Sequence, residues 1–429
     1  MDSNFISFPI TDFTTTKQQV LSWANQFSTC CFLDNHQYQF NHHTYECMLG
    51  AGAKVFLELP AGNALAQLRQ FQQHHNGWLF GHLNYDLKNE TEELVSAHQD
   101  GIGFPDLFFF VPETVILLSQ HQLCIAAADA GTANNIFIAI TTTAGHTAQP
   151  RATPVAFRQR ISKAEYIGAV EKLRGHIMRG DCYEVNFCQE FFATETNIDP
   201  VAIYHLLSEI SPAPFAAFYK TDGRYLLCAS PERYLKRQGN HIISQPIKGT
   251  RKRNLLDAAA DETGRAALYN STKERAENVM VVDLVRNDLS KICVEGSVQV
   301  DELFGIYSFP QVHQMISTVS GTLQPGLSFA DMVQQTFPMG SMTGAPKKKV
   351  MELIERFETV KRGIFSGAVG YISPGGDFDF NVVIRSILYN QPARYLSYLV
   401  GSAITFASSA EEEYEECMVK AAAIKQVFS

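Results

Sequence analysis

The chain has 429 residues, 45% of them hydrophobic, and a formal net charge of −9. A chain of this size can bury one large core or a few smaller ones, and its acidic balance argues against a nucleic-acid binder, which usually presents a basic face. No apolar run approaches the length of a membrane span, and residues 1–4 lack the basic start of a signal peptide. Nine scattered cysteines without a CxxC pair indicate reduced thiols. Together these features predict a cytoplasmic protein.

The N-terminal third reads as short strands followed by a linker. Residues 55–59 and 107–111 are β-like apolar runs. The polar, Thr-rich and helix-poor stretch 141–150 then reads as a linker, which divides residues 1–150 from residues 151–429.

After the linker, a helix start is well marked. Ser162 and Glu165 have the spacing of a capping box, and Gly180 stands where a C-terminal glycine belongs. Residues 183–191 then alternate as a half-buried strand should. Because strands dominate without regular βαβ alternation, the sequence predicts an α+β fold with antiparallel sheets. Further strands are predicted at 225–229, 241–245, 366–373, 381–389 and 395–406, and helices at 262–281, 344–358 and 411–427.

The most informative local motif is a lysine between a proline and a glycine. Lys248 stands in the sequence PIKGT, sixteen residues after Glu232 in the sequence SPER. Proline and glycine could hold the amine rigidly in a pocket, where a neutral lysine is a good nucleophile and Glu232 could act as its acid partner. The alternative is an exposed lysine in a surface turn, which local sequence favours.

Two pairs of carboxylates fall on predicted helices. Glu274 and Glu277 are three residues apart, as are Glu413 and Glu416, so each pair shares a helix face. One glutamate from each helix could hold Mg²⁺, which prefers oxygen ligands. Solvated helix faces are the alternative, most of all for the second pair, which lies in a run rich in glutamate.

Three further features are ambiguous by themselves. Residues 340–347 read as a capped, glycine-rich helix start with Thr343 or Ser341 as the cap and Pro346 in the first turn, and such a start can also seat a carboxylate. Arg385 stands in an otherwise apolar strand, where an arginine needs an anionic partner. His313 could transfer a proton or be structural.

In this order, these elements closely resemble the chorismate-utilising enzymes, a family that includes the anthranilate synthase and aminodeoxychorismate synthase large subunits. The resemblance is strongest across residues 160–429 and weaker in the N-terminal part, where residues 77–86 and 104–105 carry it. The matching segments of the stronger part are residues 180–186, 230–233, 246–251, 275–278, 282–288, 313 with 317–318, 340–347, 367–371, 384–385, and Glu416 with Lys420.

The resemblance implies a fold and a site. The fold would be two face-packed antiparallel sheets flanked by helices, in four α/β/β/α layers, with residues 1–150 interleaved with a chorismate-binding catalytic region at 151–429. The site would bind chorismate and Mg²⁺, with Glu277 and Glu416 as metal ligands and Glu274 and Glu413 in support. Chorismate would be met by Gly401 at the ring carboxylate, by Tyr371 and Arg385 at the enolpyruvyl carboxylate, by His313 near the C4 hydroxyl, and by Thr343 and Lys420 as further polar contacts.

Position 248 selects the reaction within the family. Anthranilate synthases resemble this segment but have alanine there, whereas the lysine form implies attack by Lys248 on C2, with Glu232 as general acid and with burial and Mg²⁺ favouring the neutral amine. Ammonia would then add at C4 and give 4-amino-4-deoxychorismate, the precursor of para-aminobenzoate and folate. Because the sequence has no glutaminase segment, the resemblance implies a separate glutamine amidotransferase subunit as ammonia source.

Three residues depart from the family pattern. Glu184 stands where amine-transferring members commonly have glutamine, and its role stays open. Ala403 and Ser408 alter the segment near the ring carboxylate. These departures would favour a non-catalytic chorismate-binding protein, while the presence of Lys248 and Glu232 favours an enzyme. Anthranilate synthase component I is the alternative among enzymes.

Overall fold

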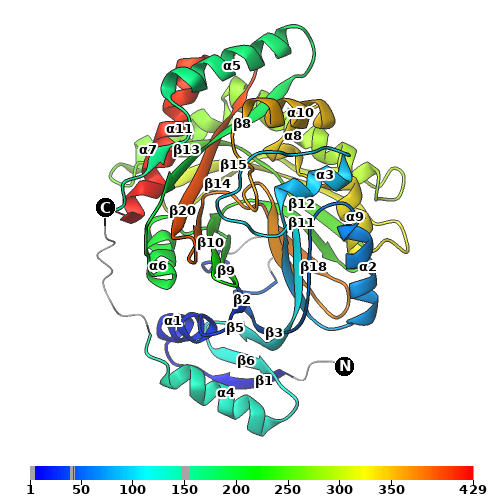
Figure 1. The fold of residues 1–429 in the computed structure, drawn as a ribbon, viewed down its shortest axis with the longest axis vertical. Coiled ribbons are helices and arrows are strands. Elements are labelled where there is room, and N and C mark those ends of the chain that lie inside the picture. The colour runs from blue at the N-terminus through cyan, green and yellow to red at the C-terminus, as the bar shows by residue number, and fades with distance from the viewer. Residues whose placement is uncertain (1–4, 39–41, 43, 146–153, 429) are drawn as a thin grey trace.

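The computed structural model describes residues 5–38, 42, 44–145 and 154–428. Its strands form antiparallel ladders with helices on both outer sides (Figure 1). The nine cysteines are all free. In the described part of the chain, none of the helices combines the length and apolar character that crossing a bilayer requires.

The first sheet is built around one long strand that contacts three others. β15 (Val312–Thr322) pairs with β14 (Gln299–Ser308) on one edge and with β12 (His241–Gln245) and β13 (Ile247–Lys252) on the other. From β12 the ladder continues through β11 (Arg233–Gln238), β18 (Phe378–Asn381), β17 (Ala368–Ile372), β4 (Leu79–Leu83) and β5 (Leu107–Leu118).

The second sheet joins the first through the long strands β5 and β3 (Cys47–Leu59). Its order from β3 is β2 (Thr29–Asp34), β9 (Phe215–Thr221), β10 (Arg224–Ser230), β19 (Ser386–Asn390), β20 (Tyr395–Ile404) and β8 (Glu184–Ala193). The short strands β7 (Arg158–Gln159) and β16 (Gly344–Ala345) pair with β8, and β6 (Gln122–Ala126) links β5 to β1 (Phe5–Pro9).

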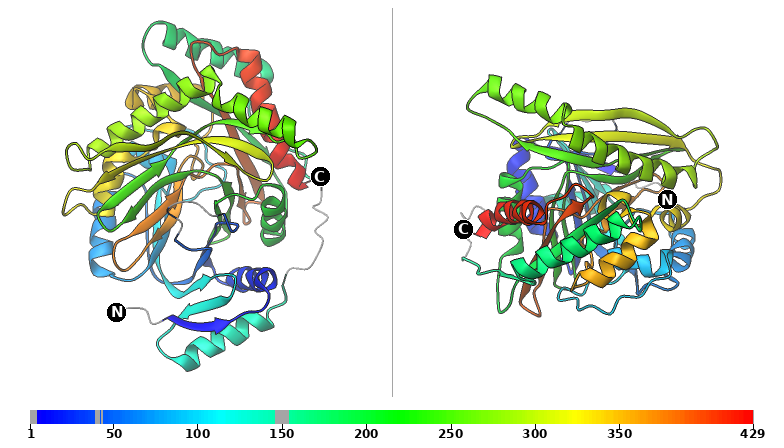
Figure 2. Two further views of the ribbon diagram at one scale, coloured as in Figure 1. Left: turned by 180° about the vertical axis from the view of Figure 1, so that it is seen from behind. Right: turned by 90° about the horizontal axis from the view of Figure 1, so that it is seen from above.

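Helices cover the outer faces of both sheets (Figure 2). The second sheet and its edges carry α1 (Phe13–Ala24), α4 (Ala130–Thr142), α5 (Lys163–Met178), α6 (Pro200–Ile210) and α11 (Ala410–Lys425), which continues into η3 (Gln426–Phe428). The first sheet carries α2 (Ala64–His74), α7 (Ala258–Tyr269), α8 (Thr272–Ser290) and α9 (Phe329–Thr336). The remaining elements are η1 (Tyr85–Leu87), α3 (Lys88–Thr91), η2 (Gly340–Met342) and α10 (Lys347–Phe357).

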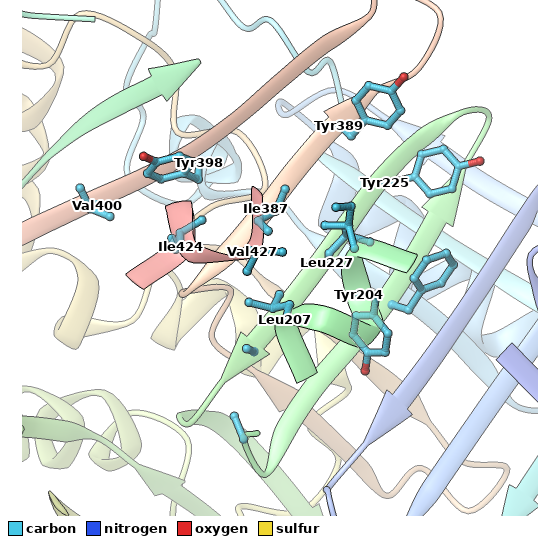
Figure 3. Packing of buried hydrophobic residues seen from close by; sticks show 14 of the residues in the cluster. Tyr204, Leu207, Tyr225, Leu227, Ile387, Tyr389, Tyr398, Val400, Ile424 and Val427 are labelled. Atoms are coloured by element: carbon cyan, nitrogen blue, oxygen red, sulfur yellow. The ribbon is translucent and has the colours of Figure 1, made fainter. Parts of the chain in front are cut away.

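Alternating side chains on the strands divide the buried hydrophobic residues into three large clusters and a small one around Met315. Between the sheets, residues such as Phe80 and Phe108 of the first sheet meet Tyr219 and Leu399 of the second. A second cluster lies between the first sheet and α2, α8 and α9, and a third packs α1, α5, α6 and α11 on the second sheet. Figure 3 shows part of this last cluster, where Leu207, Leu227 and Ile387 approach Val427. The layering confirms the predicted α/β/β/α architecture.

N-terminal strands pair directly with strands from later in the chain. β2 pairs with β9, and β4 pairs with β17, so residues from both sides of the predicted linker share both ladders. The linker prediction is wrong at its start, because Thr141 and Thr142 end α4. Residues 146–153, which include the predicted boundary at 150, lie outside the described residues, so that boundary stays a prediction.

Several predicted elements are confirmed with shifted ends. Ser162 and Glu165 form the capping box of α5, and Gly180 follows that helix with φ +82°. The predicted helix at 262–281 is wrong as one element, because it divides into α7 and α8, with the Ser271 hydroxyl accepting the Glu274 N–H at the start of α8.

Two predictions around the candidate site are also wrong in detail. Arg385 is not in a strand. It lies between β18 and β19 with φ +51°, so the strand predicted at 381–389 is interrupted and resumes only at Ser386. Neither Ser341 nor Thr343 is the N-cap of α10. Residues 340–342 form η2, Gly344 pairs with β8, and α10 starts only after Pro346, which is its N-cap.

A buried ion pair joins β8 to the segment around η2. The Arg362 guanidinium donates to the Glu358 carboxylate at 2.6 and 2.9 Å and to the backbone carbonyls of Asn186 at 2.8 Å and Met342 at 2.7 Å. Glu358 in turn accepts the Cys188 N–H at 2.9 Å. Both side chains are almost fully buried, so the pair holds strand and loop together where water cannot replace it.

We predict that Arg362→Met strongly destabilises the protein. The substitution leaves the Glu358 carboxylate buried without its partner, and breaking such a pair costs about 3–5 kcal/mol in the free energy of unfolding. Urea unfolding followed by circular dichroism measures the loss. Arg265→Met is the matched control, because its pair with Glu262 is exposed and surface pairs contribute little. Equal, small losses for both variants would contradict the prediction.

Candidate active site

Lys248 is buried against a carboxylate. Its Nζ lies 2.7 Å from Glu184 Oε1 and 3.4 Å from Asn186 Oδ1. The side chains of Lys248 and Glu184 are 11% and 1% exposed, so the surface-turn alternative is wrong. Glu184 and Asn186 are two apart on β8, which places both on one face of the strand. The Lys248 amine therefore contacts two polar side chains on one face of β8.

A bulge in β13, and not a free turn, presents this lysine. The register of β13 on β15 shifts between Ile247 and Thr250. Gly249 within the shift has φ +92°, and a Cβ there would stand 3.0 Å from Glu274 Oε2. Glycine thus permits both the backbone conformation and the close approach of α8.

The neighbours of Lys248 shift its pKa against the effect of burial. Burial lowers its pKa, but the negative charges of Glu184, Glu277 and Glu232 outweigh this effect, and the net shift of the Lys248 pKa is upward. The neutral amine that attack on the substrate requires stays a prediction.

Glu232 lies in the buried connection between β10 and β11 and is 4% exposed. Burial raises the pKa of the Glu232 carboxyl to about 7, against the opposing effects of the Ser341 hydroxyl, Lys248 and Arg385. At neutral pH the group is therefore divided between its acid and its carboxylate form. This is the protonation behaviour that a general acid needs.

Arg385 is half-buried beside Glu232. Burial lowers the pKa of its guanidinium, and the Glu232 charge opposes that shift. Among the residues that the structure describes, the Arg385 side chain has no hydrogen bond or ion pair within bonding distance. A guanidinium in this state can bind a carboxylate group of a ligand.

The four predicted metal ligands all act electrostatically on one lysine, Lys273. Burial lowers the pKa of Lys273, but the charges of Glu277, Glu413, Glu416 and Glu274 outweigh this and raise it. Helices α8 and α11 thus bring both predicted carboxylate pairs within electrostatic range of one another. The assignment of metal ligands stays a prediction.

The pKa shifts of these carboxylates differ. Burial raises the pKa of Glu277 to about 7, with Glu184 and Glu274 adding to the rise and Lys248 opposing it. Burial also raises the pKa of Glu274, whereas the effect of burial on Glu416 is outweighed by Lys420, Lys273 and Lys248, which lower its pKa. A divalent cation would relieve the repulsion at Glu274 and Glu277, so the donor set fits Mg²⁺ in its chemistry. Over residues 5–38, 42, 44–145 and 154–428, however, no three His, Cys, Asp or Glu side chains are grouped as ligands for a metal.

Lys420 connects α11 to β20. Its Nζ donates to the Gly401 carbonyl at 2.9 Å and lies 2.7 Å from Glu416 Oε1. A Cβ at Gly401 would approach Cys188 Sγ to 2.4 Å, so only glycine fits that position. Ser408, which departs from the family pattern, also has a structural role, because its hydroxyl donates to the Glu413 carboxylate at 2.8 Å.

Two predicted substrate-contacting residues have hydrogen-bond partners within the protein. The ring nitrogens of His313 contact Ser308 Oγ at 2.8 Å and Asp261 Oδ1 at 3.1 Å. The Thr343 hydroxyl donates to the Met339 carbonyl at 3.2 Å. Their predicted contacts with substrate remain untested.

Tyr371 is placed in different surroundings from Lys248. It packs against Tyr45, Trp78 and Phe80, and it lines a cavity together with Arg233 and Asp379. The structure thus groups Tyr371 with the aromatic side chains between the sheets, while Arg385 lies beside Glu232.

Sequence reasoning does not reveal the partners of Lys248 and Glu232. It gives no role to Glu184 or Asn186, which contact Lys248, and it predicts a helix cap at Ser341, which instead acts on Glu232. The alternation of β8 could have placed Glu184 and Asn186 on one face. That β13 faces them across the site depends on long-range pairing, which has no local sequence signal.

Comparison with known proteins identifies the family of the chain. The chorismate binding enzyme family matches residues 18–426. An anthranilate synthase component I-like protein of Synechocystis is 33% identical over 82% of this chain and 72% of the relative, and aminodeoxychorismate synthase component 1 of Salmonella typhimurium is 33% identical over 80% and 75%. The crystal structure of anthranilate synthase component I from Streptococcus pneumoniae covers 91% of this chain and 94% of that one, with 27% identity and a TM-score of 0.78. The chain therefore belongs to the chorismate-binding enzyme family.

Proposed function

We propose that the protein converts chorismate and ammonia to 4-amino-4-deoxychorismate. The observation that carries the proposal is the Lys248 amine, buried 2.7 Å from a carboxylate and within the electrostatic reach of Glu232. Relatives named aminodeoxychorismate synthase component 1, such as the Salmonella protein, support the same reaction.

In this reaction Lys248 is the nucleophile and Glu232 the general acid. The lysine nitrogen bonds to C2 of chorismate, the ring double bond shifts, and the C4–O bond breaks as Glu232 gives its proton to the departing hydroxyl, which leaves as water. Ammonia then bonds to C4, the double bond shifts back, and the C2–N bond breaks to free the lysine. The two displacements return the amine to the carbon that lost the hydroxyl.

Cationic groups of the chain bind the substrate's carboxylates. Arg385, whose guanidinium has no close partner among the described residues, suits the enolpyruvyl carboxylate, and Lys420 and the Gly401 backbone suit the ring carboxylate. Tyr371 is not part of this proposal, because its contacts lie with Tyr45 and Trp78.

Mg²⁺ is the proposed cofactor. Glu277 and Glu416 would hold it, with Glu274 and Glu413 in support, and the ion would supply positive charge for the substrate's carboxylate. The raised pKa values of Glu277 and Glu274 support a cation at this place.

Ammonia would come from a glutamine amidotransferase subunit. The name component 1 of several relatives supports a second component. The product would serve para-aminobenzoate and folate synthesis in the cytoplasm.

Product identification tests the proposal directly. With chorismate, Mg²⁺ and ammonium salt, the protein should release 4-amino-4-deoxychorismate without pyruvate, measured by liquid chromatography with mass spectrometry. Lys248→Ala should reduce this product by about a hundredfold or more, while Lys349→Ala, which changes a half-exposed lysine of α10, should not. Anthranilate and pyruvate as main products would instead establish the anthranilate synthase alternative. Binding of chorismate without turnover would establish a non-catalytic protein.

The acid role of Glu232 predicts a pH dependence. Because the carboxyl pKa is raised to about 7, the acid form is present below that pH and is lost above it. The rate constant kcat/KM should therefore fall as pH rises through about 7. Glu232→Gln should lose most activity together with this alkaline limb, since an amide donates no proton. If the variant kept the same fall in kcat/KM at alkaline pH, that fall would belong to a group other than Glu232.

The proposed metal site predicts that Mg²⁺ affinity rises with pH, whereas kcat/KM falls. Glu277 is protonated below its raised pKa of about 7, and a protonated carboxyl is a poor ligand, so Mg²⁺ affinity should rise as pH increases through that value. Isothermal titration calorimetry with Mg²⁺ on both sides of this pH measures the change. Glu277→Gln should weaken binding and flatten its pH dependence. Affinity independent of pH and of this substitution would place the metal elsewhere.

A further inference from the structure

Glu184 has no role in the reaction as described, yet it holds the nucleophile. Its Oε1 is 2.7 Å from Lys248 Nζ, and its side chain is 1% exposed. The second oxygen, Oε2, is buried and has no hydrogen-bond partner among the described residues. A buried carboxylate with an unused acceptor is costly for stability, and such groups are often kept for function.

The lysine requires a proton acceptor. Lys248 Nζ donates to the buried Glu184 carboxylate at 2.7 Å, and a lysine held in such an ion pair as an ammonium has no lone pair with which to attack. The nitrogen must therefore lose a proton as the bond to C2 forms. Because the group is buried, the acceptor must be a neighbouring side chain or a water admitted with the substrate.

Charged and polar groups of four segments face the lysine nitrogen. Glu184 and Asn186 come from β8, Glu274 and Glu277 from α8, Glu232 from the β10–β11 connection, and Glu416 from α11, while Lys248 itself is on β13. The Asn186 amide cannot hold a proton. Glu232 must give a proton in the same step, and Glu274, Glu277 and Glu416 belong to the proposed metal site. Glu184 is the remaining side-chain acceptor, and it is already in hydrogen-bond contact.

We propose that Glu184 is the base that accepts the proton of Lys248 during attack on C2 and returns it when the lysine departs. The proposal rests on the proposed function. In the first displacement the N–H bond of the ammonium breaks, its electron pair forms the N–C2 bond, and the proton moves to Glu184. When ammonia later forms its bond to C4, the C2–N pair returns to the lysine, which recovers its proton from Glu184.

A carboxylate differs here from the glutamine that amine-transferring members of the family commonly have. Both can accept a hydrogen bond from the lysine, but only the carboxylate can take the proton. With Glu184, deprotonation of the lysine occurs inside the pair and does not depend on bulk pH. With glutamine, the reactive free amine must form by loss of a proton to solvent, and its fraction rises with pH.

The test is the pH dependence of Glu184→Gln relative to the unmodified protein, measured with chorismate, Mg²⁺ and ammonium. The ratio of the two kcat/KM values cancels the shared contribution of Glu232. We expect a deficit of about 100-fold near pH 6 that shrinks by about tenfold per pH unit as the free amine forms. Glu184→Asp, which keeps a base, should restore part of the activity at the lower pH.

Glu190→Gln is the matched control. Glu190 stands on the same strand but pairs with Arg160 and Tyr395, so its ratio to the unmodified protein should not vary with pH. If Glu184→Gln lowered kcat/KM by the same factor at every pH, Glu184 would not be the base, and its role would be structural. Because the unmodified protein is assayed in parallel, failure of the proposed function appears separately, as absence of aminodeoxychorismate from that sample.

A second measurement needs no substrate. Competitive labelling with acetic anhydride, followed by mass spectrometry of the Lys248 peptide, reports the fraction of neutral amine at each pH. Replacing Glu184 by glutamine removes the negative charge nearest the lysine, so labelling should begin at lower pH in the variant. Identical labelling curves would show that the ion pair does not control the lysine and would overturn the proposal.

Discussion

The arrangement of the site depends on the buried pair of Arg362 and Glu358. These two side chains hold the Cys188 amide, the Asn186 carbonyl and the Met342 carbonyl at one point. They therefore fix β8, which presents Glu184 and Asn186 to the lysine, against the loop that carries Ser341. Strand pairing alone would leave this loop free to shift, because its own strand, β16, is only Gly344–Ala345.

Burial then gives the ionisable groups of the site their chemistry. The same loss of solvent that raises the pKa values of Glu232 and Glu277 to about 7 would make a lone lysine neutral. Around Lys248 the nearby carboxylates outweigh desolvation, so the net shift of its pKa is upward. The site thus has an acid in Glu232 and, in hydrogen-bond contact with the lysine, a carboxylate in Glu184 that can take the lysine's proton as the nucleophile forms.

Local patterns were enough to predict many elements and some of the site. The capping box of α5, the strand β8 and the helices that carry both glutamate pairs follow from periodicity and capping. The two-sheet fold came from resemblance. The helix at 262–281 was wrong because its amphipathic pattern continues across the break at Asn270 and Ser271, where a side-chain cap starts a new helix.

Errors near the site arose where tertiary contacts override local preference. Residues 340–347 have the composition of a capped helix start, but pairing of Gly344 with Val185 draws them into a strand. Arg385 interrupts a strand-like apolar run because it adopts φ +51° beside Glu232. The upward pKa shift of Lys248 depends on Glu184 from a strand more than sixty residues away in sequence, which no local pattern reveals.

Trapping the lysine adduct tests the central claim most directly. The protein is mixed with chorismate and Mg²⁺ without ammonia, quenched with acid, digested, and measured by peptide mass spectrometry. The account predicts that the peptide containing Lys248 gains the mass of chorismate less one water, and that ammonium added before the quench removes this gain. Steady formation of aminodeoxychorismate by a Lys248→Ala protein, with no adduct in the unmodified one, would contradict it.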